Sequence, residues 1–454
     1  MPSILANITV PIVGMVDMAV AGHLNGEAGA AAFIGAISVG AALFDLLYWN
    51  FYFLRAGTGG LTAQAYGRSD WRECVRLHLR SLGVALAISV LVLALQGPFL
   101  KLAFLFVDCS PSVRDLALRY FHVRVWAAPA TISLMALRGW FIGMQDSVSS
   151  MWVDLLVNVV NVVASIILSM GIGGWNGLGF AGIAWGTVIA QYCGLILALL
   201  IVSIKYGSRL FSHFSREDIS GAFRLEDLRS FFALNKDLFV RSLCMTTIYV
   251  AFTVISARFG DLMLASSAII MKLLMLFSFF TDGFAYAAEA LCGKYIGRKS
   301  VDMTRRSVRY VFVWSMCIAV AFVFVYIVAG VPLVRLMTSD ESVIEACCRF
   351  LPWLVLMPPL GCAAFTWDGV YEGATSARRM RNAMLLSMFF YFIFWGLGKW
   401  GLDNFAASDP DYDSLAVHIL LAAYFMHLLV RTLYLSMTYR RAILTEPFEK
   451  SERL

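Results

Sequence analysis

Apolar runs of about 20 residues recur along the whole sequence, separated only by short polar or glycine-containing stretches. A membrane hydrocarbon core about 30 Å thick is crossed by one helix of roughly 20 apolar residues. We therefore expect about twelve transmembrane helices. Their approximate ranges are 3–22, 30–54, 80–100, 116–138, 148–170, 179–204, 237–257, 264–290, 308–331, 347–367, 383–400 and 414–438.

The composition agrees with a chain whose surface faces lipid. Of the 454 residues, 60% are hydrophobic and 15% are charged, whereas soluble proteins are about one quarter charged. The predicted fold class is an all-α integral membrane protein. The net charge of +6 is explained by the placement of basic residues in loops, so we expect no nucleic-acid partner.

Basic residues lie in alternate loops. One set of loops holds 25 of the 36 Lys and Arg residues, and the positive-inside rule places that set in the cytoplasm. Both termini then face the cytoplasm of a multi-pass protein of the plasma (inner) membrane. The largest interruption begins at Lys205. We expect a six-helix lobe over 1–205, a cytoplasmic linker over 206–236, a second six-helix lobe over 237–440 and a cytoplasmic tail over 441–454.

The second half of the sequence repeats the first at a constant separation of 230 residues. The matching pairs include Gly67 and Gly297, Arg119 and Arg349, Pro129 and Pro359, Gly139 and Gly369, and Gly143 and Gly373. Six spans per half give both halves the same orientation in the membrane. A parallel repeat of this kind is typical of secondary transporters that bind substrate between their halves and work by alternating access.

Sequence motifs of enzymes and ATP-driven pumps are absent. The chain has no GxxxxGK[ST], HExxH or GxSxG motif, and none of its nine cysteines has the spacing of a zinc site. We expect no enzymatic activity, no cofactor and no bound metal. A membrane-embedded enzyme lacks support because there is no catalytic cluster, and a channel is disfavoured by the two-half repeat. If the protein is a pump, its driving force would come from an ion gradient or from a partner protein.

Ionisable residues inside the expected spans are the candidate functional groups, because each costs at least about 2.5 kcal/mol at the middle of a bilayer. Asp17 follows Pro11 by six residues in the first span, and proline kinks a helix. A carboxylate beside a kink can change the shape of the helix when it gains a proton. The alternative is that Asp17 only bonds a neighbouring helix.

The ion-coupling and substrate-cavity residues that we predict are Asp17, Asp45, Asn50, Asp154, Asn158, Asn161, Lys272 and Asp282. Asp154, Asn158 and Asn161 share one face of a helix. This polar face either lines a transport pathway or makes contacts between helices. We expect Asp45 or Asp282 to neutralise Lys272 as a structural pair. The equally supported alternative is a functional role for Lys272.

A cytoplasmic gate is predicted at Arg55, Arg138, Glu289 and Asp368. Arg138 and Asp368 occupy equivalent positions of the two halves with opposite charges. We hypothesise that such pairs latch the cytoplasmic side across the two lobes. The alternative is that each residue pairs within its own lobe or faces water. Asp368 and Glu372 are adjacent on one helix, and a solvated helix end is the simpler interpretation of that pair.

Several segments resemble the multidrug and toxic compound extrusion (MATE) family, in particular its DNA-damage-inducible F-like (DinF) branch, and the resemblance extends over nearly the whole chain. They are Asn7-Ile8-Thr9-Val10-Pro11 with Val16-Asp17 and Gly22-His23-Leu24; Phe53-Leu54-Arg55 with Gly57-Thr58 and Gly60-Leu61-Thr62-Ala63-Gln64-Ala65; Leu137-Arg138-Gly139-Trp140-Phe141; Asp282-Gly283-Phe284-Ala285; and Asp368-Gly369 with Gly373-Ala374.

The resemblance implies an antiporter that exports small organic, often cationic, compounds against an inward flow of protons or sodium ions. It also implies that Asp17 is a coupling site and that Asp154, Asn158 and Asn161 contribute to a cavity of the N-terminal lobe. The expected partners are the organic substrate and membrane lipid, and the expected state is a monomer. A flippase of lipid-linked sugars from the same wider superfamily is the alternative function.

Overall fold

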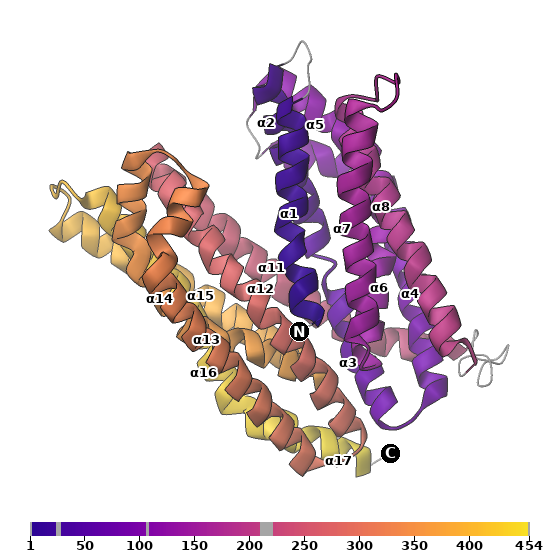
Figure 1. Cartoon of the computed structure of the whole chain (residues 1–454). Coiled ribbons are helices and arrows are strands. Elements are labelled where there is room, and N and C mark those ends of the chain that lie inside the picture. The colour runs from indigo at the N-terminus through magenta and orange to yellow at the C-terminus, as the bar shows by residue number, and fades with distance from the viewer. Residues whose placement is uncertain (1, 24–28, 106–108, 209–220, 453–454) are drawn as a thin grey trace. The chain divides into compact units, whose positions relative to one another are not determined.

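A computed structural model describes residues 2–23, 29–105, 109–208 and 221–452 of the protein (Figure 1). Within these ranges the regular secondary structure is entirely helical. The chain divides into two compact units, Met1–Phe232 and Ala233–Leu454, which we call unit 1 and unit 2. The predicted all-α membrane fold is confirmed. Among the described residues, eleven segments are long and apolar enough to cross a membrane, and helix α1 precedes them.

The helices of unit 1 mostly follow the expected spans. They are α1 (Pro2–His23), α2 (Gly29–Trp49), α3 (Phe53–Gly67), α4 (Trp71–Ala103), α5 (Pro111–Arg124), the short η1 (Val125–Ala127), α6 (Ala128–Gly143), α7 (Ser147–Met170), α8 (Phe180–Ile201) and η2 (Val202–Tyr206). Several extend well beyond the apolar runs, because polar residues continue a helix outside the hydrocarbon region as readily as apolar ones.

Unit 2 is built from longer uninterrupted helices. They are α11 (Leu225–Ser256), which begins in unit 1, η3 (Ala257–Phe259), α12 (Asp261–Gly297), α13 (Val301–Met337), α14 (Glu341–Gly373), α15 (Ala377–Phe405), α16 (Tyr412–Leu444) and α17 (Glu446–Glu452). Helix α11 begins at Leu225, inside the segment 206–236 that we expected to be a linker.

The expected span over 116–138 is divided among α5, η1 and α6, and the expected span over 30–54 is broken. The sequence predicted a single helix over 30–54, but α2 ends at Trp49 and α3 begins at Phe53. At the break the Asn50 side chain donates a hydrogen bond to the Leu46 carbonyl at 2.6 Å. Such a local bond offers the backbone an alternative to helical pairing. The counterpart helix in unit 2, α12, is unbroken.

The predicted repeat is present in the backbone at the same separation of 230 residues. Ser69 and Lys299 both adopt positive φ, at 59° and 56°, and so do Gln145 and Thr375, at 63° and 53°. Left-handed conformations are uncommon for residues other than glycine. Ser110 and Asp340 each cap a helix through a side-chain oxygen. Turns and caps therefore recur in register.

Close helix approaches also recur. A Cβ atom added to Gly139 would lie 2.2 Å from the Arg55 carbonyl oxygen, and one added to Gly369 would lie 1.9 Å from that of Ala285. The glycines thus bring α6 against α3 in unit 1 and α14 against α12 in unit 2. One turn later, Gly143 and Gly373 make the same kind of approach.

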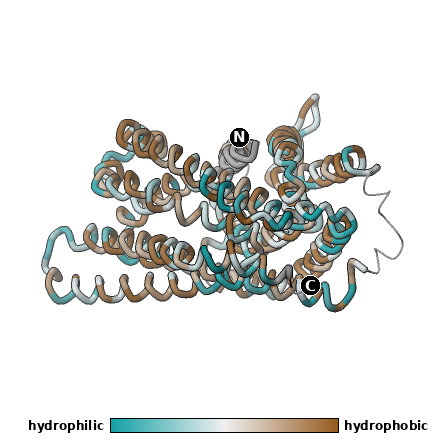
Figure 2. Tube along the Cα trace, turned by 90° about the horizontal axis from the view of Figure 1, so that it is seen from below, coloured by the Kyte–Doolittle hydropathy of each residue, from teal (hydrophilic) through white to brown (hydrophobic). Residues whose placement is uncertain are grey.

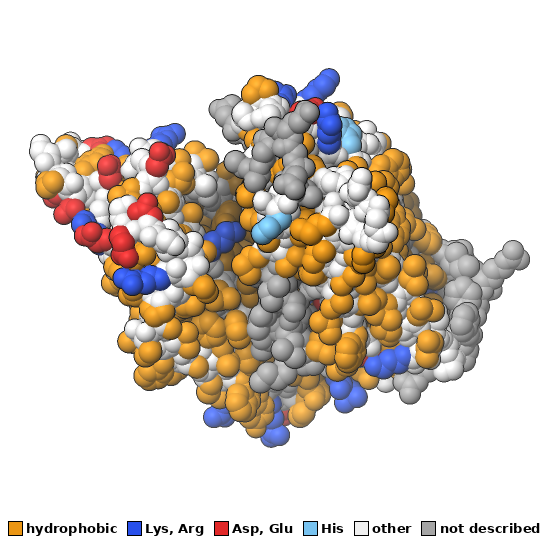
Figure 3. Space-filling model, turned by 45° about the horizontal axis from the view of Figure 1, so that its top comes forward, with side chains coloured by type: hydrophobic (Ala, Val, Ile, Leu, Met, Phe, Trp, Pro, Cys, Tyr) orange, Lys and Arg blue, Asp and Glu red, His pale blue; other side chains and the backbone are white. Residues whose placement is uncertain are grey.

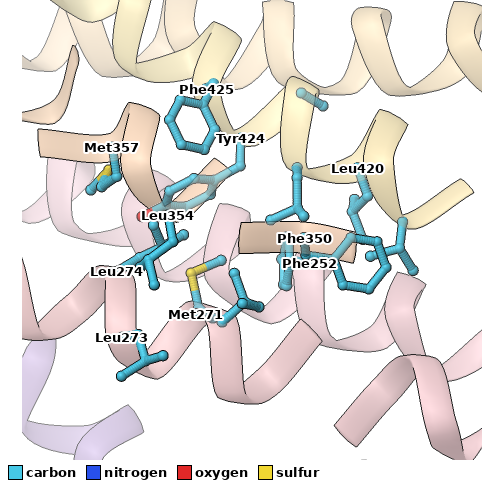
Figure 4. Packing of buried hydrophobic residues seen from close by; sticks show 14 of the residues in the cluster. Phe252, Met271, Leu273, Leu274, Phe350, Leu354, Met357, Leu420, Tyr424 and Phe425 are labelled. Carbon is cyan, nitrogen blue, oxygen red and sulfur yellow. The ribbon is translucent and has the colours of Figure 1, made fainter. Parts of the chain in front are cut away.

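The interior and the outer surface are both apolar. Hydrophobic residues run along the helices, and hydrophilic residues gather where helices are joined (Figure 2). Hydrophobic side chains cover much of the face seen in Figure 3. Large exposed side chains such as Val90 on α4 and Val328 on α13 suit contact with lipid. In unit 2 a large cluster packs side chains of α11, α12, α14 and α16, including Phe252, Met271 and Phe350 (Figure 4).

Candidate functional site

Asp17 lies in the interior of unit 1. It sits on α1 and is 7% exposed. The Ser165 hydroxyl on α7 lies beside its carboxylate, and Arg124 at the end of α5 is within electrostatic range. Burying a carboxylate at this depth is costly unless a charge, a proton or a cation compensates it. Arg124 supplies one such charge, and a proton or cation on Asp17 would supply another.

The polar stripe of α7 has two separate sets of contacts. Asn161 is buried and its side chain donates to the Thr187 hydroxyl on α8 at 3.0 Å. Asp154, two turns away, forms an ion pair with Arg138 of α6 at 2.5 Å. Asn158 lies between them and is partly exposed. Thr187 also lies beside Tyr120, which is within electrostatic range of Asp17, so the Asn161 end of the stripe lies near the surroundings of Asp17.

Arg124 stands among aromatic rings close to Asp17. Its Nη1 donates to the Tyr120 hydroxyl at 2.9 Å, and its Cζ lies 4.7 Å from the ring centroid of Phe44. Asp45 and Tyr48 of α2 are also within electrostatic range of this guanidinium. Asp17 and Asp45, both predicted from the sequence, thus share the environment of one arginine.

A second charged cluster is buried in unit 2. Asp368 of α14 is paired with Arg241 of α11 and with Arg431 of α16. Arg241 also lies 3.8 Å from Glu372. Because Asp368 and Glu372 are both buried, the solvated helix end considered for them is wrong.

The remaining predicted residues have different environments. Asp282 is within electrostatic range of Arg431, and Glu289 is fully buried in unit 2. Lys272 is exposed, and its pairing with Asp45 or Asp282 stays a prediction. Arg55 is buried with its guanidinium 4.6 Å from the Tyr52 ring.

For the gate, the structure shows pairs inside each unit. Arg138 is bound to Asp154, and Asp368 is bound to Arg241 and Arg431. These contacts correspond to the alternative in which each residue pairs within its own lobe. A latch between Arg138 and Asp368 stays a prediction, as does that between Arg55 and Glu289.

Outside the spans, Asp146 links three segments of unit 1. It caps α7 through Ser149 and accepts hydrogen bonds from Lys205 and Tyr206, each at 2.7 Å. Burial opposes ionisation, but the hydrogen bonds from Lys205, Ser149 and Tyr206 outweigh it and lower the pKa of Asp146. The carboxylate therefore joins η2, which follows α8, to the start of α7.

Three arginines were missed by the sequence reasoning, which considered mainly carboxylates. Arg124, Arg241 and Arg431 all lie inside expected spans, and that position was the available signal. Ser165 and Thr187 carried no such signal, since hydroxyls are common in membrane helices. Among the described residues, no group of three His, Cys, Asp or Glu side chains is arranged to hold a metal ion.

Comparison with known proteins extends over most of the chain. A family model described as MatE matches residues 2–167 and 238–395. DNA damage-inducible protein F of Escherichia coli K12 is 34% identical over 391 residues, which cover 85% of this chain and 82% of that protein. The multidrug resistance protein MdtK of Edwardsiella ictaluri is 21% identical, with 87% of this chain and 84% of that protein covered.

Solved structures share the fold at low sequence identity. A MOP superfamily transporter from Pyrococcus furiosus has a TM-score of 0.83 at 15% identity, covering 97% of this chain and 94% of its own. An outward-facing multidrug resistance MATE family transporter also has a TM-score of 0.83, at 14% identity, covering 98% and 94%.

Proposed function

Since the chain belongs to the multidrug and toxic compound extrusion (MATE) family, we propose that it exports small organic, often cationic, compounds by exchange for protons or sodium ions. The chain is a membrane transporter and not an enzyme. We further propose that it works as a monomer in the inner membrane, surrounded by lipid. The names of relatives such as the multidrug resistance protein MdtK support export of organic compounds.

The observation that carries the proposal is the buried carboxylate of Asp17 in unit 1. We propose that Asp17 binds the coupling ion, with Ser165 and Asn161 supplying neighbouring polar groups. A proton or sodium ion on Asp17 removes a negative charge from a site of low dielectric, where such a change acts strongly. A cationic substrate and the coupling ion then compete for the same charge, which is what exchange requires.

The alternative of a lipid-linked-sugar flippase is not favoured by the family match. The described interior charges of the two units also include both signs. Asp17 and Asp45 accompany Arg124 in unit 1, and Asp368 and Glu372 accompany two arginines in unit 2. A site for a polyanionic pyrophosphate would need an excess of positive charge.

Transport into proteoliposomes tests the role of Asp17. Purified protein is reconstituted, a proton or a sodium gradient is imposed, and movement of a cationic dye is followed. We expect Asp17→Asn to abolish gradient-driven transport while the protein remains folded, because the ion-binding charge is gone. Asp115→Asn is the matched control, since Asp115 is an exposed carboxylate paired only with Arg119 among the described residues.

Normal transport by Asp17→Asn under both gradients would show that another group couples the ion. Transport by the wild-type protein under each gradient separately identifies that ion.

Labelling of introduced cysteines from either side of the membrane tests the proposed topology, with the segment 206–236 and both termini in the cytoplasm. Protection of the central segment from a reagent on the cytoplasmic side would contradict it.

A further inference from the structure

Two arginines near the start of α13 carry charges that no carboxylate balances in the part of unit 2 that the structure describes. Arg305 and Arg309 are exposed and lie one helical turn apart. Neither side chain forms an ion pair or a hydrogen bond with another described residue. Asp302, in the first turn of the same helix, is likewise unpaired among these residues. Both guanidinium groups are therefore free to bind an anion from outside the protein.

The side of α13 that carries these arginines faces two neighbouring helices. Arg305, Arg309 and Phe312 follow one another at helical spacing and so share one side of α13. The ring of Phe312 lies 4.6 Å from that of Trp367 on α14. Arg305 is within electrostatic range of Tyr439 on α16. The charges therefore stand beside aromatic rings where α13 begins and α16 ends.

Trp367 joins α13 to α16 at this place. Its ring lies 5.0 Å from the ring of Tyr439, and its Nε1 donates a hydrogen bond to the Ser436 hydroxyl at 2.9 Å. Trp367 itself is buried. The two outer helices, which run beside each other in Figure 1, are thus held over a fixed aromatic base.

Helix α16 adds a third exposed arginine. Arg440 lies one turn after Ser436 and so continues the same side of α16 toward its end. Glu446, a carboxylate at this end of unit 2, is already paired with Arg379 at 2.8 Å and with Arg441 at 3.1 Å. We call the surface formed by Arg305, Arg309, Phe312, Ser436, Tyr439 and Arg440 the arginine–aromatic patch. Its charge is positive.

Farther along both helices the exposed side chains become apolar. They include Met316 and Val320 on α13 and Leu433 and Met437 on α16. Because the two helices run in opposite directions, these residues lie on the same side of the patch, away from the arginines. Charge, aromatic rings and apolar side chains thus succeed one another. That order matches the phosphate, the interfacial region and the acyl chains of a phospholipid in a bilayer.

We propose that the arginine–aromatic patch binds the phosphate of an anionic phospholipid. Arg305, Arg309 and Arg440 donate to the phosphate oxygens, since a guanidinium fork fits that group. The acyl chains follow the apolar side chains of α13 and α16. A zwitterionic phospholipid has the same phosphate, but its own ammonium group offsets the charge. The inference goes beyond the proposed export function and does not depend on it. The competing explanation is that these arginines only set the orientation of the helices in the membrane.

Binding to purified full-length protein in detergent distinguishes the two explanations. Native mass spectrometry counts bound phospholipid during titration with phosphatidylglycerol or phosphatidylcholine of identical acyl chains. The variants are Arg305→Gln and the double variant Arg305→Gln with Arg309→Gln. Arg378→Gln is the matched control. Arg378 is an exposed arginine in the first turn of α15, at the same end of unit 2, where Ser376 donates to the Ala442 carbonyl of α16.

An arginine near an anionic lipid contributes a factor of about five to binding. We therefore expect Arg305→Gln to weaken binding of phosphatidylglycerol about fivefold, and the double variant to weaken it about twentyfold. Phosphatidylcholine should bind the wild type more weakly than phosphatidylglycerol does, and neither variant should change its affinity. Unchanged binding of phosphatidylcholine also shows that the variants are folded. Arg378→Gln should leave the affinity for both lipids unchanged, because Arg378 lies outside the patch.

Three results would overturn the assignment. They are equal weakening of phosphatidylglycerol binding by Arg378→Gln and Arg305→Gln, wild-type affinity in the double variant, and equal affinity of the wild type for the two lipids. Inorganic phosphate is the last arm of the experiment. It should not displace phosphatidylglycerol at equal concentration, because it lacks the acyl chains. Displacement would identify a free phosphate as the ligand and would overturn the assignment to a lipid.

Discussion

Helix α7 of unit 1 and helix α15 of unit 2 occupy equivalent places in the repeat, yet their inner faces differ in polarity. Asp154, Asn158, Asn161 and Ser165 on α7 correspond to Met384, Met388, Tyr391 and Trp395 on α15, each pair being 230 residues apart. The α15 side chains belong to the hydrophobic cluster of unit 2 or pack against it. One copy of the helix therefore supports a polar site and the other a packed core.

The same contrast holds between α5 and the equivalent part of α14. Tyr120 and Arg124 correspond to Phe350 and Leu354, which lie in the packed cluster of Figure 4. Caps, left-handed turns and glycine contacts are nevertheless shared by the two units. The comparison shows that the backbone framework is independent of what fills the interior. The two units build the same framework around a polar and an apolar interior, which favours a functional role for the polar groups near Asp17.

The largest expected effect concerns the buried charges of unit 2. Asp368→Asn leaves Arg241 and Arg431 without their shared carboxylate, and Arg431 has a side chain only 1% exposed. Removing one partner of a buried ion pair costs about 3–5 kcal/mol. We expect a corresponding loss of thermal stability in detergent, measured by tryptophan fluorescence on heating.

The comparison variant is Asp154→Asn in unit 1, which leaves Arg138 unpaired but 29% exposed. The loss in free energy of unfolding caused by Asp154→Asn should exceed the roughly 0–1 kcal/mol of an exposed ion pair. It should stay below the roughly 3–5 kcal/mol of a buried ion pair. Adding Arg431→Met to Asp368→Asn should recover part of the lost stability. Equal melting temperatures for Asp368→Asn and the wild type would contradict the assigned pairing.

A smaller effect tests the framework that the units share. Gly139→Ala and Gly369→Ala each place a methyl group against a backbone carbonyl oxygen, at 2.2 Å and 1.9 Å. Since the backbones must separate, we expect each change to reduce the free energy of unfolding by about 1–3 kcal/mol. Thermal unfolding of the two variants in the same detergent is the measurement.

Gly396→Ala is the control for that pair, because no atom lies within 4 Å of the added Cβ. It should raise stability by roughly 0.5–1 kcal/mol through helix propensity. A clear loss of stability for the variant in one unit, and no loss for the variant in the other, would contradict the prediction that both units depend on the same close approach of helices.

The smallest expected effect compares Asp146 with its counterpart Ser376, which precedes α15 without a side-chain cap. The lowered pKa of Asp146 means that its stabilising contribution is complete above the ordinary aspartate pKa of about 3.9 and is lost as pH falls through the lower folded value. Lys205 is half exposed, so solvent screening limits the contribution to about 1 kcal/mol.

Asp146→Asn should therefore lower the melting temperature at pH 7 and flatten the loss of stability between pH 5 and the acid limit of folding. Ser376→Ala should do neither. An unchanged pH dependence in Asp146→Asn would show that its hydrogen bonds to Lys205, Ser149 and Tyr206 do not stabilise the ionised form.

Most of the fold could be predicted from the sequence, because apolar length and a repeated register are local properties. The break at Asn50 could not, since it depends on one side chain bonding its own helix. For the site, the sequence indicated Asp17, Asp45 and Asn161 but not Arg124, Ser165 or Thr187. Helical periodicity tells which residues share a face, and it does not tell which helix faces them. Arg138 illustrates this limit, because its partner is Asp154 of the next helix in the chain.

The constant separation of the left-handed residues has a consequence for engineering. Between Ser69 and Gln145 the chain has the same length as between Lys299 and Thr375, so no net insertion or deletion separates the two copies there. Residues 69–146 and 299–376 are thus interchangeable cassettes in terms of chain length. A chimaera that carries the first cassette twice would keep the left-handed turns at both of its ends in phase and would add a second Arg124, with its aromatic neighbour Tyr120, to the other half.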